Sequence, residues 1–472
     1  MEHQSAFLGR LNKKLPVENY RANSYGFVGN IANNMMMRAQ PMRKDGYDID
    51  VVLHPQDRYV MSRPGWELSD LVLPEGISDV DELAALGMDL PHVDWAVDET
   101  DQINAQKLIN AAHATPPYRW RSSHQAASYM RQLDVLLYDA YLNYQPLLDR
   151  LQKYDALFAS QAPYLAYLSG KPYLAAQTGG DLYFEASRDD MFGRLQRGSY
   201  QKAKAILATN PWTFSAARRF GFKHVLYAPL LIDVDVYKPG PRRLREEWIE
   251  KTGDGFFVLA TARLDLRWKG SDVALEGFKR FASKNPQARL LLVGWGSDVE
   301  AVISDLSAAG LSERVIVLPV AGKKRLRDYL RSADCVLDQF KVGYYGGTAL
   351  EAMACGAPVI MRLLTEQYDA LCKTGAPPVL NAGTPDEVAV SLQTLIDSKQ
   401  TQSMISQAGI KWIEQNHTAN VWGDTYGMLL AASAEGVMFD FSGSPLQGTL
   451  SDAEKEYHAS ALASAPTFPN YV

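Results

Sequence analysis

Short apolar runs, each followed by a stretch with helical spacing, organise this chain. One series begins with IDVV, between Asp48 and Leu53, and continues at residues 157–159, 173–176, 205–208 and 225–228. A second series lies at residues 256–260, 289–293, 315–318, 335–337 and 359–361. Apolar runs that alternate with helical segments are typical of parallel strands connected through helices. Two such series predict an α/β protein with two doubly wound domains.

The link between the two series lies in DVYKPGPRRLREEW, residues 235–248, where prolines, a glycine and arginines interrupt the apolar rhythm. We expect a first domain over residues 1–240 and a second over residues 241–425. Residues 55–145 show no clear strand–helix alternation, and we interpret them as an insertion in the first domain. Residues 426–472 form a tail that is a candidate for packing back on the first domain.

Composition and charge exclude several classes of protein. The 472 residues carry a net charge of -6, which argues against a nucleic-acid partner because phosphate backbones are held by clustered Lys and Arg. The three cysteines and eight histidines lack disulfide or metal-ligand spacing, so we expect no metal and no other cofactor. A signal peptide and a run of about 18 apolar residues are both missing. We expect a cytoplasmic protein, and peripheral contact with the inner face of a membrane stays open.

The residues that follow the second series of runs are candidates for ligand binding, because ligands of open parallel sheets lie beyond the carboxyl ends of the strands. They include two cations, a glycine turn and a carboxylate. In chain order they are Arg263, Lys269, Gly294, Pro319, Val320, Asp338 and Gly343.

Gly346 and Gly347 directly precede TALEAMA, a run of good helix formers that begins at Thr348. The first amides and the dipole of such a helix favour an anion, and glycine lets that anion approach the backbone. Arg263 and Lys269 are expected to neutralise it from the other side. Glu351, one turn into the helix, is suited to accept hydrogen bonds from two sugar hydroxyls. The combination predicts a site for a nucleoside diphosphate with its ribose.

These residues carry a resemblance to family 4 of the retaining GT-B glycosyltransferases. Its members have a similar Arg and Lys, a VGxG-like turn and a segment resembling ADxxxxPSxxEGFGxxxLEAMACGxPVI. The matching residues here are Ala333-Asp334, Gly346, residues 350–356 and residues 358–360. The resemblance implies a GT-B fold, with two doubly wound Rossmann-like domains facing a central cleft. It also implies that Glu351 holds the ribose, that Arg263 and Lys269 hold the diphosphate as catalytic residues, and that the base lies against Pro319 and Val320.

One departure from the family pattern falls on the donor sugar. The first Glu of the family's E-x7-E pair corresponds to Gly343, and the Pro-Ser before it corresponds to Gln339-Phe340. Asp338 or a backbone group would have to replace that Glu. A similar DQ…GxYG…E variant is found in a subgroup of polysaccharide-assembly glycosyltransferases, which the chain resembles.

The amino-terminal half resembles the family more faintly. GFVGNIANN has the form of a first strand and its glycine turn, so Gly26, Gly29 and Asn30 are expected to face the cleft of an acceptor-binding domain. QTGGD, residues 177–181, follows an apolar run where the family often has a histidine-bearing loop. Because no histidine stands there, Asp181 is the remaining catalytic candidate.

The sequence therefore predicts a metal-independent, retaining, hexosyltransferase-like enzyme. It would move a sugar from a nucleoside diphosphate sugar to a hydroxyl of a glycan or lipid-linked acceptor in surface polysaccharide synthesis. The main alternative is a sugar-nucleotide or glycan binding protein of the same fold with impaired catalysis. A phosphorylase or epimerase is a further alternative. A Rossmann oxidoreductase requires G-x-G-x-x-G in the first turn, and GFVGNIA lacks that spacing.

Overall fold

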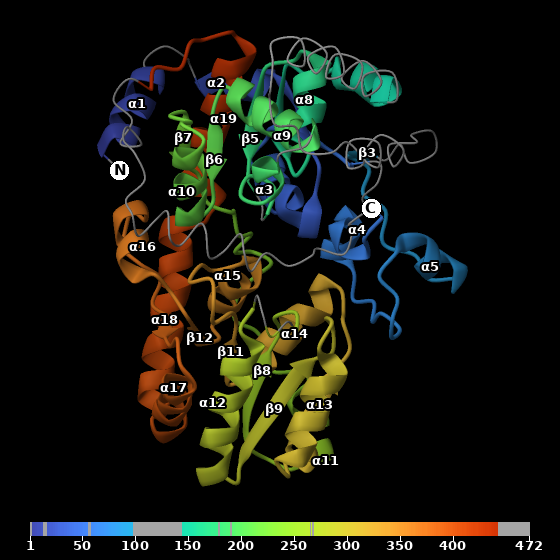
Figure 1. Cartoon of the computed structure of the whole chain (residues 1–472), viewed down its shortest axis with the longest axis vertical. Coiled ribbons are helices and arrows are strands. Elements are labelled where there is room, and N and C mark those ends of the chain that lie inside the picture. The colour runs from blue at the N-terminus through green and yellow to red at the C-terminus, as the bar shows by residue number, and fades with distance from the viewer. Residues whose placement is uncertain are drawn as a thin grey trace, which may run out of the picture. The chain divides into compact units, whose positions relative to one another are not determined.

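The computed structural model describes residues 2–12, 17–54, 58–97, 144–177, 180–188, 191–264, 266 and 269–441. Its contacts divide the chain into two compact units. Unit 1 contains the described residues of Met1–Pro64, His92–Pro229 and Trp422–Val472, and unit 2 contains those of Gly65–Pro91 and Leu230–Val421. Figure 1 labels their helices and strands.

Unit 1 is built on a seven-stranded parallel sheet with strand order β3-β2-β1-β4-β5-β6-β7. Its central strands are buried on both faces, which is typical of a parallel sheet covered by helices on both sides. The direction of winding reverses between β1 and β4, so a ligand is expected beyond the carboxyl ends of these two strands. The strands are β1 (Ser24–Val28), β2 (Asp48–Val52), β3 (Ala96–Val97), β4 (Ala156–Ser160), β5 (Tyr173–Ala176), β6 (Ile206–Ala208) and β7 (Val225–Tyr227).

The described helices of unit 1 cover its sheet. The α-helices are α1 (Glu2–Asn12), α2 (Val17–Ala22), α3 (Asn34–Lys44), α8 (Pro163–Ser169), α9 (Met191–Lys202), α10 (Pro211–Arg219) and α19 (Ala419–Ala434), the last of which enters unit 1 at Trp422. The 3-10 turns are η1 (Ile31–Asn33), η2 (Val60–Ser62) and η3 (Glu185–Ser187).

Unit 2 is built on a six-stranded parallel sheet with strand order β10-β9-β8-β11-β12-β13. The winding reverses between β8 and β11, where Ala260 pairs with Leu337 at the carboxyl ends of the two strands. This reversal marks the expected ligand edge of the sheet. The strands are β8 (Phe256–Ala260), β9 (Ala288–Val293), β10 (Val315–Leu318), β11 (Cys335–Leu337), β12 (Val359–Met361) and β13 (Leu380–Asn381).

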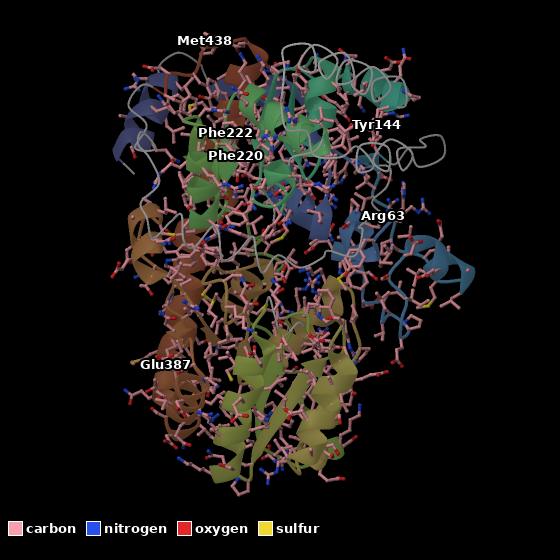
Figure 2. All side chains as sticks on the ribbon, viewed as in Figure 1. Arg63, Tyr144, Phe220, Phe222, Glu387 and Met438 are labelled. Carbon is pink, nitrogen blue, oxygen red and sulfur yellow. The ribbon has the colours of Figure 1, made fainter. Side chains whose placement is uncertain are left out.

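The helices of unit 2 pack through apolar stripes. Residues of α12 at helical spacing, such as Leu275, Phe278 and Ala282, are buried in the main core of the unit. The neighbouring α17 begins with a capping box of Thr384 and Glu387, and Figure 2 labels Glu387. The described helices are α4 (Pro64–Leu68), α5 (Val80–Ala85), α11 (Arg245–Thr252), α12 (Ser271–Lys284), α13 (Val299–Ala308), η4 (Ser312–Arg314), α14 (Lys323–Ser332), α15 (Gly347–Ala354), α16 (Thr365–Leu371), α17 (Pro385–Asp397) and α18 (Lys399–Asn416).

The predicted strands of both series are confirmed within one or two residues at each end, and so is the fold of two doubly wound α/β units. The division of the chain differs from the predicted one. We assigned residues 55–145 to an insertion in the first domain, but Gly65–Pro91 belongs to unit 2. Residues 98–143 and 442–472 lie outside the described residues. No described helix is long and apolar enough to span a bilayer.

Candidate functional site

The loops after β8 and β11 bring the predicted cations and glycines of unit 2 to one edge of its sheet. Arg263 and Lys269 follow β8, and Asp338 directly follows β11. Because Ala260 and Leu337 are paired neighbours, these two loops start side by side. The sheet therefore assembles at one edge the residues that the sequence separates by about 70 positions.

Lys269 is fixed between the two loops. Its ammonium donates to Oε1 of Gln339 at 2.9 Å, and its carbonyl accepts from the backbone N–H of Phe340 at 2.8 Å. The side-chain amide of Gln339 in turn donates to the carbonyl of Tyr344. Gln339 thus connects the predicted phosphate-binding lysine to the loop that leads into α15. Where the family has a Pro-Ser pair, this chain has Gln339, and its side-chain amide holds the loop between β11 and α15 by hydrogen bonds.

Asp338 lies at the start of α15. Its carboxylate accepts a hydrogen bond from the backbone N–H of Gly346, and the charge of Lys269 lies nearby. Burial raises the pKa of Asp338, although Lys269 and the Gly346 N–H oppose this shift. A second oxygen, Oδ2, is buried and makes no hydrogen bond within the described part of the chain. A raised pKa lowers the negative charge that Asp338 would present to an anion at this helix.

Gly343 and Gly346, which precede α15, are glycines for different physical reasons. Gly343 has a φ of 74°, and a Cβ there would come within 2.8 Å of the Leu364 side chain. This conformation strains any residue with a Cβ, a glutamate included, and so is consistent with the departure from the family pattern. Gly346 is the N-cap of α15, and an added Cβ would meet no heavy atom within 4 Å. The open space beside Gly346 is compatible with the predicted approach of an anion to Gly347 and Thr348, the first residues of the helix.

Glu351 is fully buried, with an exposure of 0%, inside α15. Its Oε1 lies 2.5 Å from the ammonium of Lys323, the first residue of α14, and its Oε2 has no hydrogen-bond partner among the described residues. A buried carboxylate oxygen without a partner is costly, and a ligand hydroxyl would satisfy it. A ribose can reach this oxygen only after a neighbouring side chain moves, because Glu351 is covered in this structure.

The remaining predicted donor residues have structural partners. Gly294 continues β9, where a Cβ would come within 2.8 Å of the Val317 side chain, so packing alone explains the glycine. Pro319 and Val320 follow β10, and the Val320 carbonyl accepts from the backbone N–H of Leu73 at 2.8 Å. The loop that the family resemblance assigns to the base is therefore partly covered by the segment Gly65–Pro91.

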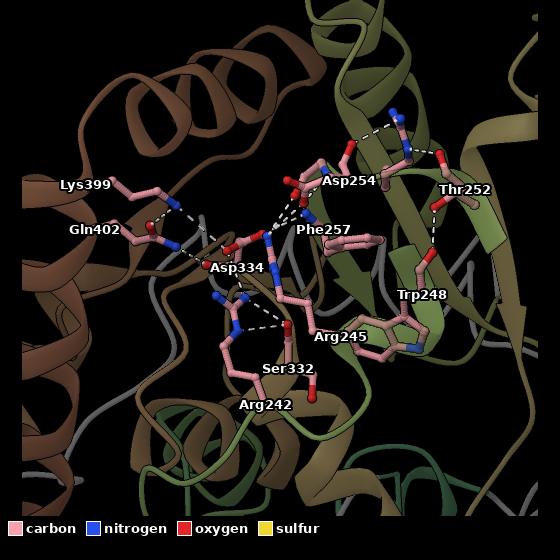
Figure 3. A network of polar contacts seen from close by, with 12 residues as sticks. Arg242, Arg245, Trp248, Thr252, Asp254, Phe257, Ser332, Asp334, Lys399 and Gln402 are labelled. Atoms are coloured by element: carbon pink, nitrogen blue, oxygen red, sulfur yellow. Dashed lines mark hydrogen bonds and ion pairs between the residues drawn. The ribbon is translucent and has the colours of Figure 1, made fainter. Parts of the chain in front are cut away.

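Asp334, in the matched Ala333-Asp334 pair, is an anchor for α11 rather than a ligand-binding group (Figure 3). Its carboxylate is 1% exposed and accepts from Arg242 at 2.8 Å, from Arg245 at 3.0 Å and from the Phe257 N–H at 2.9 Å. Burial alone raises the pKa of Asp334, but the arginines and the Phe257 N–H hold it below its usual value. The network ties α11 and the loop before it to strand β8 and to the start of β11.

In unit 1, local structure accounts for the three predicted cleft residues. Gly26 lies inside β1, where a Cβ would come within 2.6 Å of the Tyr154 ring. Gly29 has a φ of 78°, and a Cβ would lie 2.4 Å from the carbonyl of Ser160. Asn30 is buried and fully hydrogen-bonded, since Oδ1 accepts from the N–H groups of Met35 and Met36 at the start of α3. Gly29 and Asn30 thus join the carboxyl ends of β1 and β4 to α3.

Asp181, which is buried, and Glu185, which is partly exposed, form an acidic pair in unit 1. Oδ2 of Asp181 accepts from the hydroxyl of Tyr200 at 2.6 Å. Burial, together with the charge of Asp181, raises the pKa of Glu185 to about 7. Oε2 of Glu185 also accepts from the Gln196 amide at 2.8 Å. A carboxyl group whose pKa is raised to near neutral is typical of acid–base chemistry, and buried structural carboxyl groups show the same shift.

Sequence reasoning missed four residues that complete these sites. Lys323 follows the loop of Pro319 and Val320, which the family resemblance assigns to the base. The sequence shows it as a cation shortly after the end of β10. Gln339 and Glu185 had only weak signals, as neighbours of Asp338 and Asp181. Glu67, a buried residue of α4 that accepts from the hydroxyl of Tyr237, had none, because its partners lie far away in the sequence. Among the described residues, no group of three or more His, Cys, Asp and Glu side chains is arranged to hold a metal ion.

Residues 244–412, all within unit 2, match the family model described as glycosyl transferases group 1. Unit 2 carries a group 1 glycosyltransferase domain. The matched residues include every predicted donor-binding residue of unit 2 and exclude Glu67.

The chain is similar to curated proteins over part of its length. It is 27% identical to mannosylfructose-phosphate synthase of Agrobacterium fabrum over 176 residues, which are 35% of this chain and 38% of that protein. It is 24% identical to D-inositol 3-phosphate glycosyltransferase of Nocardiopsis dassonvillei over 209 residues, 42% of this chain and 47% of that protein. The chain thus spans less than half the length of these relatives.

Solved structures match both units together and share the GT-B fold. Anabaena Alr3699/HepE, solved in complex with UDP and glucose, matches 87% of this chain and 100% of its own with 15% identity and a TM-score of 0.58. Sucrose-phosphate synthase of Thermosynechococcus elongatus matches with the same coverage and identity and a TM-score of 0.56. At these identities the likeness establishes the fold of the group 1 domain and of unit 1.

Proposed function

We propose that the protein is a glycosyltransferase that moves a sugar from a nucleoside diphosphate sugar to a hydroxyl of a glycan or lipid-linked acceptor. The observation that carries the proposal is the ligand edge of unit 2. There Lys269, the open start of α15 and the unpartnered oxygen of Glu351 come together inside a group 1 glycosyltransferase domain. The complexes of Alr3699/HepE with UDP and with UDP-glucose support a nucleotide-sugar donor.

The diphosphate would lie at the start of α15, where the first amides and the dipole of the helix favour an anion. Lys269 and Arg263 would stabilise the charge that develops on the leaving phosphate, usually the largest electrostatic contribution to such a step. No bound metal is needed in this arrangement. Each charge-assisted hydrogen bond would contribute roughly 1.5–3 kcal/mol.

The reaction proceeds with retention in this proposal. The bond between the anomeric carbon and the phosphate oxygen breaks, and a bond from that carbon to the acceptor oxygen forms on the same face. A leaving-phosphate oxygen accepts the hydroxyl proton, so the transfer requires no separate base. In unit 1, Asp181 and Glu185 are the residues that we assign to acceptor binding.

The proposed setting is surface polysaccharide synthesis in the cytoplasm, with an acceptor that is either soluble or carried by a lipid at the inner face of a membrane. The resemblance of the DQ…GxYG…E variant to polysaccharide-assembly enzymes supports this setting. A flotation assay with vesicles would test whether the protein associates with lipid.

The proposal is tested by incubating the full chain with UDP, GDP and ADP sugars and a panel of glycan acceptors. We expect release of the nucleoside diphosphate to depend on acceptor, to continue in EDTA and to be lost in Glu351→Ala. The anomeric proton of the product, read by NMR, should keep the configuration of the donor. Full activity of Glu351→Ala would contradict the assigned ribose site.

A binding protein with impaired catalysis is the second candidate, and Gly343 is the observation that favours it. Its φ of 74°, and the short distance of 2.8 Å that a Cβ would have to the Leu364 side chain, disfavour the family's glutamate at this position. Tight binding of a donor without turnover over the whole acceptor panel would support this alternative. Phosphate-dependent turnover in the absence of acceptor would instead indicate a phosphorylase.

A further inference from the structure

The segment Gly65–Pro91 is part of unit 2 although the residues on both sides of it belong to unit 1. It lies along the loop after β10 and the start of α14, where Val72 and Ala321 form an antiparallel bridge. Three backbone hydrogen bonds fix it there: Leu73 N–H to Val320 at 2.8 Å, Gly322 N–H to Leu71 at 2.8 Å and Lys324 N–H to Ser69 at 2.9 Å. The segment therefore covers the loop that the family resemblance assigns to the base.

Glu67, in α4 of this segment, is 5% exposed. Its Oε1 accepts from the hydroxyl of Tyr237, which fixes the carboxylate. Its Oε2 has no hydrogen-bond partner among the described residues. A buried carboxylate is unstable in its charged form unless an opposite charge lies nearby.

The compensating group is the ammonium of Lys323. Burial alone lowers the pKa of Lys323, but the carboxylates of Glu351 and Glu67 raise it overall. The pKa of Glu67 is raised by burial and by Glu351, against the opposing charges of Lys323 and Arg327. Two buried carboxyl groups are therefore close to one ammonium, and in the described part of the chain each keeps one oxygen, Oε2, without a donor.

The two unpartnered oxygens restrict the chemistry of a ligand. A phosphate is excluded beside them, because like charges repel in a buried site. Hydroxyl or N–H donors of a neutral group fit, since they satisfy a carboxylate oxygen without adding charge. A nucleoside carries both kinds of donor, on its ribose and on the edge of its base.

We propose that Glu67 is a second nucleoside-binding carboxylate of unit 2, which accepts a hydrogen bond from the donor nucleoside through Oε2, beside Glu351. The inference rests on the proposed function. It extends the donor site beyond the matched residues 244–412 to the segment Gly65–Pro91. The specificity for the nucleoside then depends on a part of the chain that the family model does not match.

The test is a calorimetric titration of the full chain with UDP, GDP, ADP, 2′-deoxy-UDP and inorganic pyrophosphate. Glu67→Gln, which keeps the size of the side chain, should bind its preferred nucleoside diphosphate about tenfold or more weakly than the wild type. Pyrophosphate should bind both equally. Glu75→Gln is the matched control, because Glu75 is exposed on the same segment.

The other ligands identify which part of the nucleoside Glu67 contacts. A loss that disappears with 2′-deoxy-UDP assigns the bond to the ribose, and a loss that differs among the three bases assigns it to the base. Equal affinities of Glu67→Gln and wild type for every nucleoside diphosphate overturn the inference alone. A wild type that binds none of them contradicts the proposed function as well.

Glu67→Asp provides a second variant in case Glu67→Gln fails to fold. It keeps the charge beside Lys323 but withdraws the carboxylate from its position. Weaker nucleotide binding with unchanged pyrophosphate binding is the expected result, and wild-type affinity for all the nucleotides would again overturn the inference.

Discussion

At the scale of single residues, the two glycines before α15 differ in role: Gly343 is structural, and Gly346 is the one that we assign to anion binding. Gly343 has a left-handed φ of 74° and a side chain, that of Leu364, against it. Gly346 has ordinary backbone angles and open space beside it. The two positions lie three residues apart in the same loop, so they serve as controls for each other.

We predict that Gly346→Ala folds with an unchanged free energy of unfolding but binds pyrophosphate about tenfold or more weakly, because the methyl group obstructs the approach of the anion. Gly343→Ala should lose about 1–3 kcal/mol of stability, since the backbone there is strained for any residue with a Cβ. Chemical unfolding and titration with pyrophosphate measure the two effects. Wild-type affinity in Gly346→Ala would contradict the assigned diphosphate position.

Glu185 gives unit 1 a pH dependence with a definite sign. Its folded pKa of about 7 lies above the value near 4.3 expected in the unfolded chain, so folding favours the neutral acid. Its contribution to stability is complete below pH 4 and is lost as the pH rises through 7. Glu185→Gln should therefore gain about 1–3 kcal/mol relative to wild type between pH 5 and pH 8. An unchanged difference between the two proteins over this range would contradict the shift.

At the scale of elements, the strands of unit 2 were predictable because their apolar runs are buried on both faces. The short strands β3 and β13, of two residues each, carry no such run and were missed. Arg263, Lys269 and Asp338 could be placed at one edge of the sheet from the sequence because the carboxyl ends of parallel strands meet there, whereas Glu351 was placed by its position in the helix after the glycines. Their partners, Gln339 and Lys323, were missed because a pattern along the chain does not say which side chains meet.

The anchor of α11 yields a prediction for acid unfolding. Asp334→Asn should lose roughly 3–5 kcal/mol of stability at neutral pH, since the substitution removes the buried carboxylate with which Arg242 and Arg245 form ion pairs. The folded pKa of Asp334 is lowered, so its contribution is present above the unfolded pKa near 3.9 and is lost as the pH falls below it. The difference between wild type and variant should therefore shrink on acidification. A difference that stays constant down to pH 2 would argue against the ion pairs.

At the scale of the whole molecule, neither unit is a continuous stretch of sequence. The chain enters unit 2 at Gly65, returns to unit 1 at His92, enters unit 2 again at Leu230 and leaves it at Trp422. The predicted boundary at residue 240 came from a Pro- and Arg-rich linker, which marks only one of these passages. The sequence places the segment Gly65–Pro91 in the first domain because of its position along the chain. Its few apolar residues, such as Leu73, are buried by residues far away in the sequence, and no local pattern reveals those contacts.

The central claim is that unit 2 binds a nucleoside diphosphate, with its diphosphate beside Lys269 and its ribose at Glu351. The most direct measurement is the dissociation constant of pyrophosphate and of UDP, GDP and ADP for wild type, Lys269→Ala and Glu351→Gln. We predict that Lys269→Ala weakens pyrophosphate and nucleotides alike, by about tenfold or more, whereas Glu351→Gln weakens the nucleotides and leaves pyrophosphate unchanged. Nucleotide affinities equal to wild type in both variants would contradict the claim.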